Sequence, residues 1–150
     1  MNIEIAKTRD PIHQFSVYAD NKVGRLNDLV NLLSRNDLHI VAISTLDTTD
    51  SALIRIIVDY PVQVRDLLKK NEFCFNETEV VAVELNSEAE IKHITTALLQ
   101  AEVNINYIYP FILRPHGKYG LVIRLEDNDL AIDVLTRNRI KTLTQGDIAR

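Results

Sequence analysis

Apolar positions in the first half of the chain recur with two periods, which predict strands and helices in a fixed order. Residues 15–19 alternate, as expected for a strand with one buried face. From Leu26 to Leu33 the apolar side chains follow the i, i+3, i+4, i+7 spacing of one helical face. The pattern then predicts strands at 38–46 and 53–58, a helix that begins at Pro61, and a fourth strand that begins at 73–75.

The same order of elements is predicted a second time, and a separate strand at 80–85 opens this second half. Residues 24–43 align with 89–108, so that Leu29 meets Ile94 and Leu33 meets Leu98, and we expect all four side chains to be buried. Each half has the order β-α-β-β-α-β, which is typical of an antiparallel four-stranded sheet with both helices on one face. We therefore predict an α+β protein of two ferredoxin-like repeats, at residues 1–77 and 78–150. No flexible linker separates the halves, so they should pack closely.

The sheet face turned away from the helices is also predicted to be covered. In the third strand Leu53, Arg55 and Ile57 point to this face, and the second strand is apolar on both sides. A solvated face would be more polar. We expect either the other half or another chain to cover it; the alternative is a set of scattered exposed apolar residues.

Composition narrows the classes of function. The net charge of −4 and the pI near 5.5 argue against a dedicated nucleic-acid binder. The longest apolar run is far below the roughly 18 residues that span a bilayer, and charged residues interrupt the start of the chain where a secretory signal would be apolar. A single cysteine forms no internal disulfide. We expect a soluble, cytoplasmic protein with no membrane or nucleic-acid partner.

The sequence contains no recognisable catalytic, metal or cofactor motif. Its glycines do not form a G-x-G-x-x-G loop, and no H-E-x-x-H or G-x-S-x-G motif occurs. Cys74, between Phe73 and Phe75, is interpreted as a small apolar core residue. The histidines have no paired ligand spacing, and we expect His13, His39 and His93 to be structural or solvated. We therefore predict that the protein is not an enzyme and that it has no cofactor or metal.

The connection between the first strand and the first helix carries the clearest motif. Residues 19–26 read ADNKVGRL, which resembles the signature loop N-x-P-G-x-L of the ACT domain, a small-molecule regulatory module. The stretches DLHI at 37–40 and EVNI at 102–105 resemble the G-I-N-I start of that family's second strand. Over residues 13–147 the chain resembles the tandem-ACT proteins. Val23 stands at the usual proline, and the second loop, NSEA at 86–89, has neither the proline nor the glycine.

The resemblance implies that an amino acid binds as a regulatory signal at an interface between ACT domains. A glycine at a helix start lets the backbone approach a ligand, and the N–H groups of the helix end favour a carboxylate. Asn21 would orient the ligand and Lys22 or Arg25 would add positive charge, whereas Glu88 would repel a carboxylate from the second loop. The candidate ligand-binding residues are Asn21, Lys22, Val23, Gly24, Arg25, Leu26, Ile43, Ser44 and Thr45, with Tyr107–Tyr109 as an alternative opposite wall. In the purely structural alternative, Gly24 relaxes a turn and Asn21 caps the helix.

These observations leave two classes of function. The leading interpretation is a non-catalytic regulatory protein that acts as a homodimer or through a regulated metabolic enzyme. The alternative is an assembly protein that keeps the ACT fold but has lost ligand binding, which Val23 and the altered second loop favour. RNA binding is a third class with the same order of elements, but it needs aromatic side chains on the central strands. Residues 53–58 and 120–125 contain none.

Overall fold

Helices and strands follow one another in the predicted order in the computed structural model, which describes residues 10–20, 22–48 and 50–149. The first half contains β1 (Ile12–Ala19), α2 (Lys22–Arg35), β2 (Ile40–Asp47), β3 (Ala52–Val58), α3 (Pro61–Lys70) and β4 (Cys74–Leu85). The second half contains α4 (Glu90–Gln100), β5 (Ile105–Pro110), the 3-10 helix η1 (Pro115–Gly117), β6 (Tyr119–Leu125), α5 (Asn128–Arg137), β7 (Lys141–Leu143) and α6 (Gln145–Ile148). The predicted α+β fold of two ferredoxin-like repeats is confirmed.

One long strand, β4, belongs to both halves. Within the described residues the strands form a seven-stranded sheet in the order β2-β3-β1-β4-β6-β5, and β7 pairs with β4 beside this path. The first part of β4 pairs with β1 as far as Val80, and from Val81 onward β4 pairs with β6. The expectation of two separate strands, at 73–75 and 80–85, is therefore wrong. The domain boundary between residues 77 and 78 lies inside this strand and stays a prediction.

Polar residues in the middle of β4 explain why the sequence pattern indicated an interruption. Glu77 accepts two hydrogen bonds of 2.6 Å from Arg65 of α3, and the His13 imidazole lies 2.7 Å from the same carboxylate. Asn76 donates to the Tyr18 hydroxyl at 2.9 Å. The hydrogen bonds from Arg65 hold the pKa of Glu77 below its usual value, so this carboxylate is charged and paired at neutral pH. In the middle of β4, polar contacts as well as apolar packing therefore hold the strand in place.

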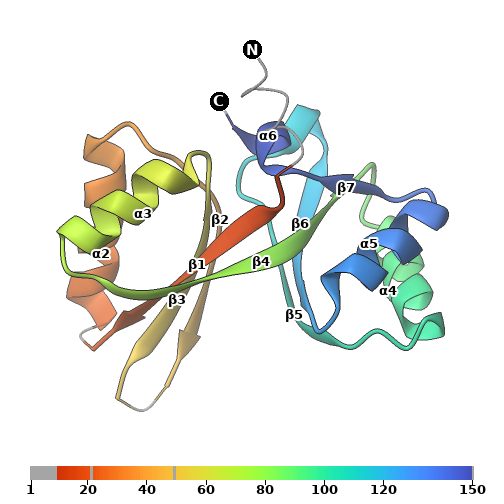
Figure 1. Cartoon of the computed structure of the whole chain (residues 1–150), viewed down its shortest axis with the longest axis horizontal. Helices are drawn as coiled ribbons and strands as arrows, with labels where there is room; N and C mark the ends of the chain where they lie inside the picture. The colour runs from red at the N-terminus through yellow and green to blue at the C-terminus, as the bar shows by residue number, and fades with distance from the viewer. Residues whose placement is uncertain (1–9, 21, 49, 150) are drawn as a thin grey trace.

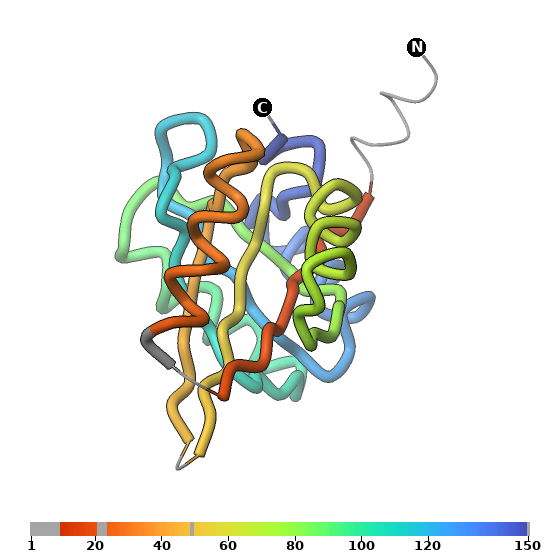
Figure 2. The backbone as a smooth tube through the Cα atoms, turned by 90° about the vertical axis from the view of Figure 1, so that its left-hand side faces the viewer, coloured from red at the N-terminus to blue at the C-terminus, as the bar shows by residue number. Residues whose placement is uncertain are grey.

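Four helices, α2, α3, α4 and α5, lie on the two outer sides of the molecule with the strands between them, whereas α6 lies near the middle (Figure 1). α2 and α3 cover one end of the curled sheet, and Figure 2 shows them in front of the strands, whereas α4 and α5 cover the other end. Leu29 and Leu33 of α2, and Ile94 and Leu98 of α4, are at most 1% exposed, as predicted. Each half therefore has its own apolar core between its helices and the sheet.

The inner face of the sheet, which is turned away from the helices, packs against itself and forms a third core between the halves. Its buried side chains are Ile12, Val41, Ala42, Ile57, Val80, Ala82, Tyr109, Val122, Leu143 and Ile148. Ala42 forms a β-bridge with Phe111, and the Ile112 N–H donates to the Val41 carbonyl at 2.7 Å. Gly120 makes room for Phe111, because a Cβ at this glycine would lie 2.1 Å from the Phe111 ring. We expected either the other half or another chain to cover this face, and in this part of the face it is the other half of the same chain.

The second half covers only part of the inner face. Tyr18 and Leu46 lie on this face near the β2–β3 turn, and they are 43% and 47% exposed. Figure 1 shows the β2–β3 hairpin extending beyond the rest of the sheet at this end. Cys74 pairs with Tyr18 and is exposed. The expectation that Cys74 is a core residue is therefore wrong, because β4 begins where the inner face is open.

Two residues beyond the end of each of the helices α2, α3, α4 and α5 lies a residue with a left-handed backbone that is not glycine. These residues are Asp37, Glu72, Glu102 and Arg139, with φ angles of 55°, 59°, 58° and 62°. The next N–H returns to the last helical turn, as from Leu38 to the Leu33 carbonyl at 3.0 Å. Asp37 and Glu102 occupy the glycine position of the two G-I-N-I-like stretches. The left-handed backbone explains why glycine suits that position, and this chain keeps the geometry without the glycine.

Candidate functional site

A cavity lies where α2 meets the end of β2 and the start of β3. Its volume is about 250 Å³, and its lining residues are Leu26, Thr45, Leu46, Asp47, Ala52 and Ile54. Two of the predicted ligand-binding residues, Leu26 and Thr45, are brought together here. The cavity lies at the end of the first half where α2 begins.

Small residues and an open sheet edge leave this cavity unfilled. Ala52 lies opposite Asp47 in β2 and opposite Ala19 in β1, so short side chains meet at this corner of the sheet. Thr45 lies opposite Ile54, which places both side chains on the helix side. β2 is the edge strand of the sheet path. The cavity therefore combines an aliphatic floor with a hydroxyl and a carboxylate at its rim.

The positive end of α2 faces this corner of the molecule. The helix begins at Lys22, and its first turn contains no acidic residue. Gly24 is exposed and lies within that first turn. Among the glycines in the described part of the chain, Gly117 has a positive φ, whereas Gly24 is part of the helix. Because Gly24 has no side chain, it leaves space at the helix start. The helix dipole would favour a carboxylate placed there.

Other predicted site residues lie elsewhere. The Arg25 guanidinium stacks on the Phe73 ring at 3.9 Å and lies 3.6 Å from the Asp28 carboxylate, so it points away from the cavity. Ser44 is on the inner face, opposite Arg55, because neighbouring strand residues alternate between faces.

The remaining residues of the predicted ligand-binding set either pack in the core or are not fully described by the structure. Ile43 packs against the first apolar core. Asn21 lies outside the described residues, and for Lys22 and Val23 only the helical backbone is described. The ligand-binding role of the set stays a prediction.

The second loop differs from the first in the way its helix begins. α4 begins at Glu90, and Ala89 is its N-cap without a side-chain capping bond. The Glu90 carboxylate accepts hydrogen bonds from the backbone N–H of Asn86 at 3.3 Å and from its side-chain amide at 3.2 Å. Glu90 thus closes the loop and offsets the positive helix end itself. The repulsion expected from Glu88 stays a prediction, and Glu90 adds a second carboxylate at this helix start.

A second group of polar side chains lies on the inner face where the two halves meet. Gln14 is fully buried, accepts a hydrogen bond of 2.6 Å from Tyr109 and donates one of 2.7 Å to Tyr107. The Arg55 guanidinium stacks on the Tyr107 ring at 3.7 Å. Burial raises the pKa of Tyr109 far above its ordinary value, so its hydroxyl keeps its proton. The tyrosines proposed as an alternative wall therefore face Gln14 and Arg55, two residues that sequence analysis did not propose as site residues.

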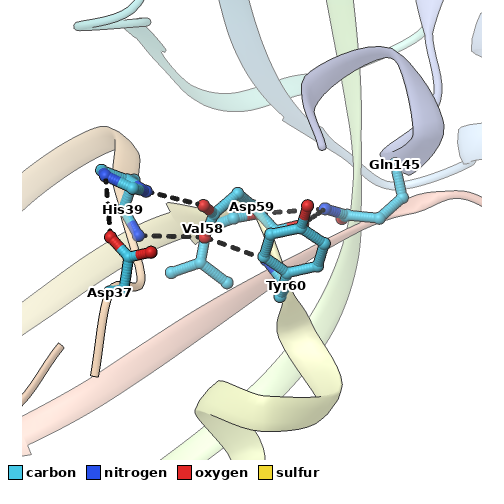
Figure 3. A network of polar contacts seen from close by, with 6 residues as sticks. All are labelled: Asp37, His39, Val58, Asp59, Tyr60 and Gln145. Atoms are coloured by element: carbon cyan, nitrogen blue, oxygen red, sulfur yellow. Dashed lines mark hydrogen bonds and ion pairs between the residues drawn. The ribbon is translucent and has the colours of Figure 1, made fainter. Parts of the chain in front are cut away.

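A third polar group ties α6 to the first half (Figure 3). The buried Asp59 carboxylate accepts hydrogen bonds from the backbone N–H groups of His39 at 3.0 Å and Tyr60 at 3.1 Å, and it lies 2.9 Å from the His39 imidazole. Gln145 of α6 donates to the carbonyls of Val58 and Asp59. His39 is therefore structural, as expected, and this network holds the two halves together.

Two further features bear on the class of protein. Among residues 10–20, 22–48 and 50–149, no cluster of three or more histidine, cysteine or acidic side chains has an arrangement suited to a metal ion. None of the helices in the same part of the chain has the length and apolar character needed to cross a bilayer.

Comparison with known proteins identifies relatives at the levels of family and fold. A family model described as an ACT domain pair matches residues 10–150. The structure is similar to protein BT0572 from Bacteroides thetaiotaomicron, at 26% identity and a TM-score of 0.85, over 93% of this chain and 96% of that one. No curated protein matches the sequence.

Two structures of aspartate kinase regulatory subunits share the fold. The first, from Thermus thermophilus in its ligand-free form, has 12% identity and a TM-score of 0.60 over 86% of this chain and 91% of that chain. The second, from Thermus flavus, has 11% identity and a TM-score of 0.55 over 87% and 93%.

Proposed function

The chain belongs to the ACT domain pair family, and we propose that it is a non-catalytic regulatory protein that binds an amino acid at the cavity beside α2. The observation that carries this proposal is the cavity itself, which joins Leu26 of the signature-like loop to Thr45 of β2. The ligand carboxylate lies at the start of α2, where the helix dipole favours it. Its ammonium lies toward Thr45 and Asp47, and its side chain lies on Leu26, Ala52 and Ile54.

The size of the cavity limits the ligand class. A volume of about 250 Å³ is below the roughly 300–1,000 Å³ of pockets for drug-sized molecules. A nucleotide or other extended metabolite does not fit, whereas a small amino acid does. The apolar floor favours an aliphatic side chain over a charged one.

We further propose that a second copy of the chain completes the site, so that the ligand lies between ACT domains. β2 is an edge strand, and Leu46 beside the cavity is 47% exposed, so a partner strand or helix has an open surface to cover. Light scattering at micromolar concentration should give about twice the chain mass of 17.1 kDa. A monomer at all concentrations would overturn the dimer but leave the cavity within one chain as the binding site.

Regulation of a partner enzyme is part of the same proposal. The similar structures include regulatory subunits of aspartate kinase, which supports a role in controlling a catalytic protein in trans. The enzyme controlled by this chain is a separate question, and a pull-down that compares ligand-loaded with ligand-free protein addresses it.

A thermal-shift screen with the twenty amino acids, each at millimolar concentration, tests ligand binding. We expect one or a few amino acids to raise the melting temperature in a saturable way, because a ligand at about 100 times its Kd stabilises the folded state by about 2.7 kcal/mol. The alternative is an assembly protein without a ligand, which Val23 in the first loop and the Glu90-closed second loop favour. No response to any amino acid in a stable dimer would establish that alternative.

A further inference from the structure

We propose that Arg55 is the centre of a second binding site, for a phosphate or carboxylate anion, where the inner faces of the two halves meet. This site is on the opposite side of the sheet from the cavity beside α2 and does not rest on amino-acid binding there. Arg55 lies in the middle of β3, between the apolar residues Leu53 and Ile57 of the same face. A charged side chain in that place needs a partner.

No carboxylate among the described residues pairs with Arg55. Other arginines do have acidic partners, as Arg65 has Glu77 and Arg137 has Asp133. Arg55 instead stacks on Tyr107 at 3.7 Å, and its Nε is buried without a hydrogen-bond acceptor. A buried donor without an acceptor destabilises the folded state, more so when the group is charged. An anion bound at the partly exposed part of the guanidinium would supply the missing charge.

The hydrogen bonds around Gln14 turn neighbouring hydroxyls into donors. Tyr109 donates to the Gln14 amide oxygen, which fixes the direction of the amide. The amide nitrogen then donates to the Tyr107 hydroxyl at 2.7 Å and to the Ser16 hydroxyl at 3.3 Å. Both hydroxyls act as acceptors toward Gln14, so the proton of each is left for another acceptor. Donors therefore accumulate around Arg55, which is the requirement for an acceptor-only ligand.

Strand register adds two hydroxyls at the sides of the guanidinium. Ser16 of β1 and Ser44 of β2 lie directly opposite Arg55 in the two neighbouring strands, so all three side chains share the inner face. Arg124 lies opposite Tyr107 in β6 and adds positive charge, while its own Nη1 donates to the Leu125 carbonyl. The acidic residue of this face, Glu84, is paired with His116 and Lys141 in the β7 region.

Solvent reaches this group from the uncovered end of the inner face. Arg55, Ser16 and Ser44 are partly exposed, and Tyr18 and Leu46 beyond them are exposed. We expect an anion to reach the guanidinium from this side. Because Arg55 and the serines belong to the first half and Tyr107 to the second, a bound anion would bridge the two ACT domains and stiffen their junction.

The test compares Arg55→Gln with the matched control Arg114→Gln. Arg114 also stacks on a tyrosine, Tyr119 at 4.4 Å, but both residues belong to the second half. Inorganic phosphate and succinate are titrated separately into each protein at constant ionic strength, with amide chemical shifts as the readout. We expect saturable shifts around Arg55 with one or both anions, at least tenfold weaker binding in Arg55→Gln, and unchanged binding in Arg114→Gln. The stronger of the two anions identifies the ligand class.

A second variant keeps the test independent of folding. Ser44→Ala retains the Arg55–Tyr107 stack and should weaken the anion several-fold with an unchanged melting temperature. The Gly24→Asp change at the other site should leave the anion titration unaltered, so this proposal and amino-acid binding can fail separately. The anion site is overturned if the parent gives no saturable response to either anion. It is also overturned if Arg55→Gln binds like the parent, or if Arg114→Gln loses as much.

Discussion

Replacing Leu33 or Leu98 with alanine is expected to lower the free energy of unfolding by about 2–5 kcal/mol. The two leucines occupy equivalent places in the repeats, and they are 1% and 0% exposed beneath α2 and α4. Each truncation removes buried apolar area and leaves a space that the packed helix and sheet fill only in part. Urea denaturation, followed by far-ultraviolet circular dichroism, measures the change as a lower midpoint.

Leu99→Ala is the matched control for this pair. Leu99 is the next residue along α4, and it is 76% exposed, so its truncation should change the unfolding free energy by less than about 0.5 kcal/mol. Because β4 runs through both halves, we expect Leu33→Ala and Leu98→Ala to shift the same single transition. A midpoint of Leu98→Ala equal to that of the parent would contradict the assigned helix face. Two separate transitions would show that the halves unfold independently.

The order of elements is predictable from the sequence because it depends on local periods. Leu29 and Leu33 repeat along one helical face, and their equivalents Ile94 and Leu98 repeat along another, so short-range spacing was sufficient to place four core residues. The continuity of β4 depends instead on distant partners. From the sequence alone, Glu77 in the middle of this strand indicates a turn. In the structure Arg65 and His13 lie beside it and pair with its carboxylate.

The candidate sites also include residues that local patterns predict and residues that depend on distant contacts. Leu26 and Thr45 follow from the loop motif and the neighbouring strand, and the cavity contains both. Ser44 was grouped with them although strand alternation places it on the other face. The Arg55–Tyr107 contact depends on how the sheet curls and brings β3 against β5. No local pattern encodes that curvature, so a lone arginine in an apolar strand was the only signal available.

Gly24→Asp is expected to abolish amino-acid binding while the fold is retained. The new carboxylate would lie in the first turn of α2, fill space left by the glycine and repel the ligand carboxylate. The helix itself should not suffer, because aspartate near a helix N-terminus is favourable and glycine within a helix is not. Calorimetric titration with the amino acid that shifts the parent's melting temperature measures the loss. Circular dichroism and the ligand-free melting temperature confirm the fold.

Ala89→Asp is the control in the second repeat, because Ala89 aligns with Gly24. Glu90 already closes that loop through Asn86, so one more carboxylate should leave the affinity almost unchanged. Gly24→Ala adds a methyl group without charge and separates steric from electrostatic loss; we expect it to weaken binding less than Gly24→Asp does. Equal losses in Gly24→Asp and Ala89→Asp would mean that both helix starts bind ligand. Full binding by Gly24→Asp would place the amino acid away from α2, because a carboxylate at the helix start and a ligand carboxylate cannot share the same N–H groups.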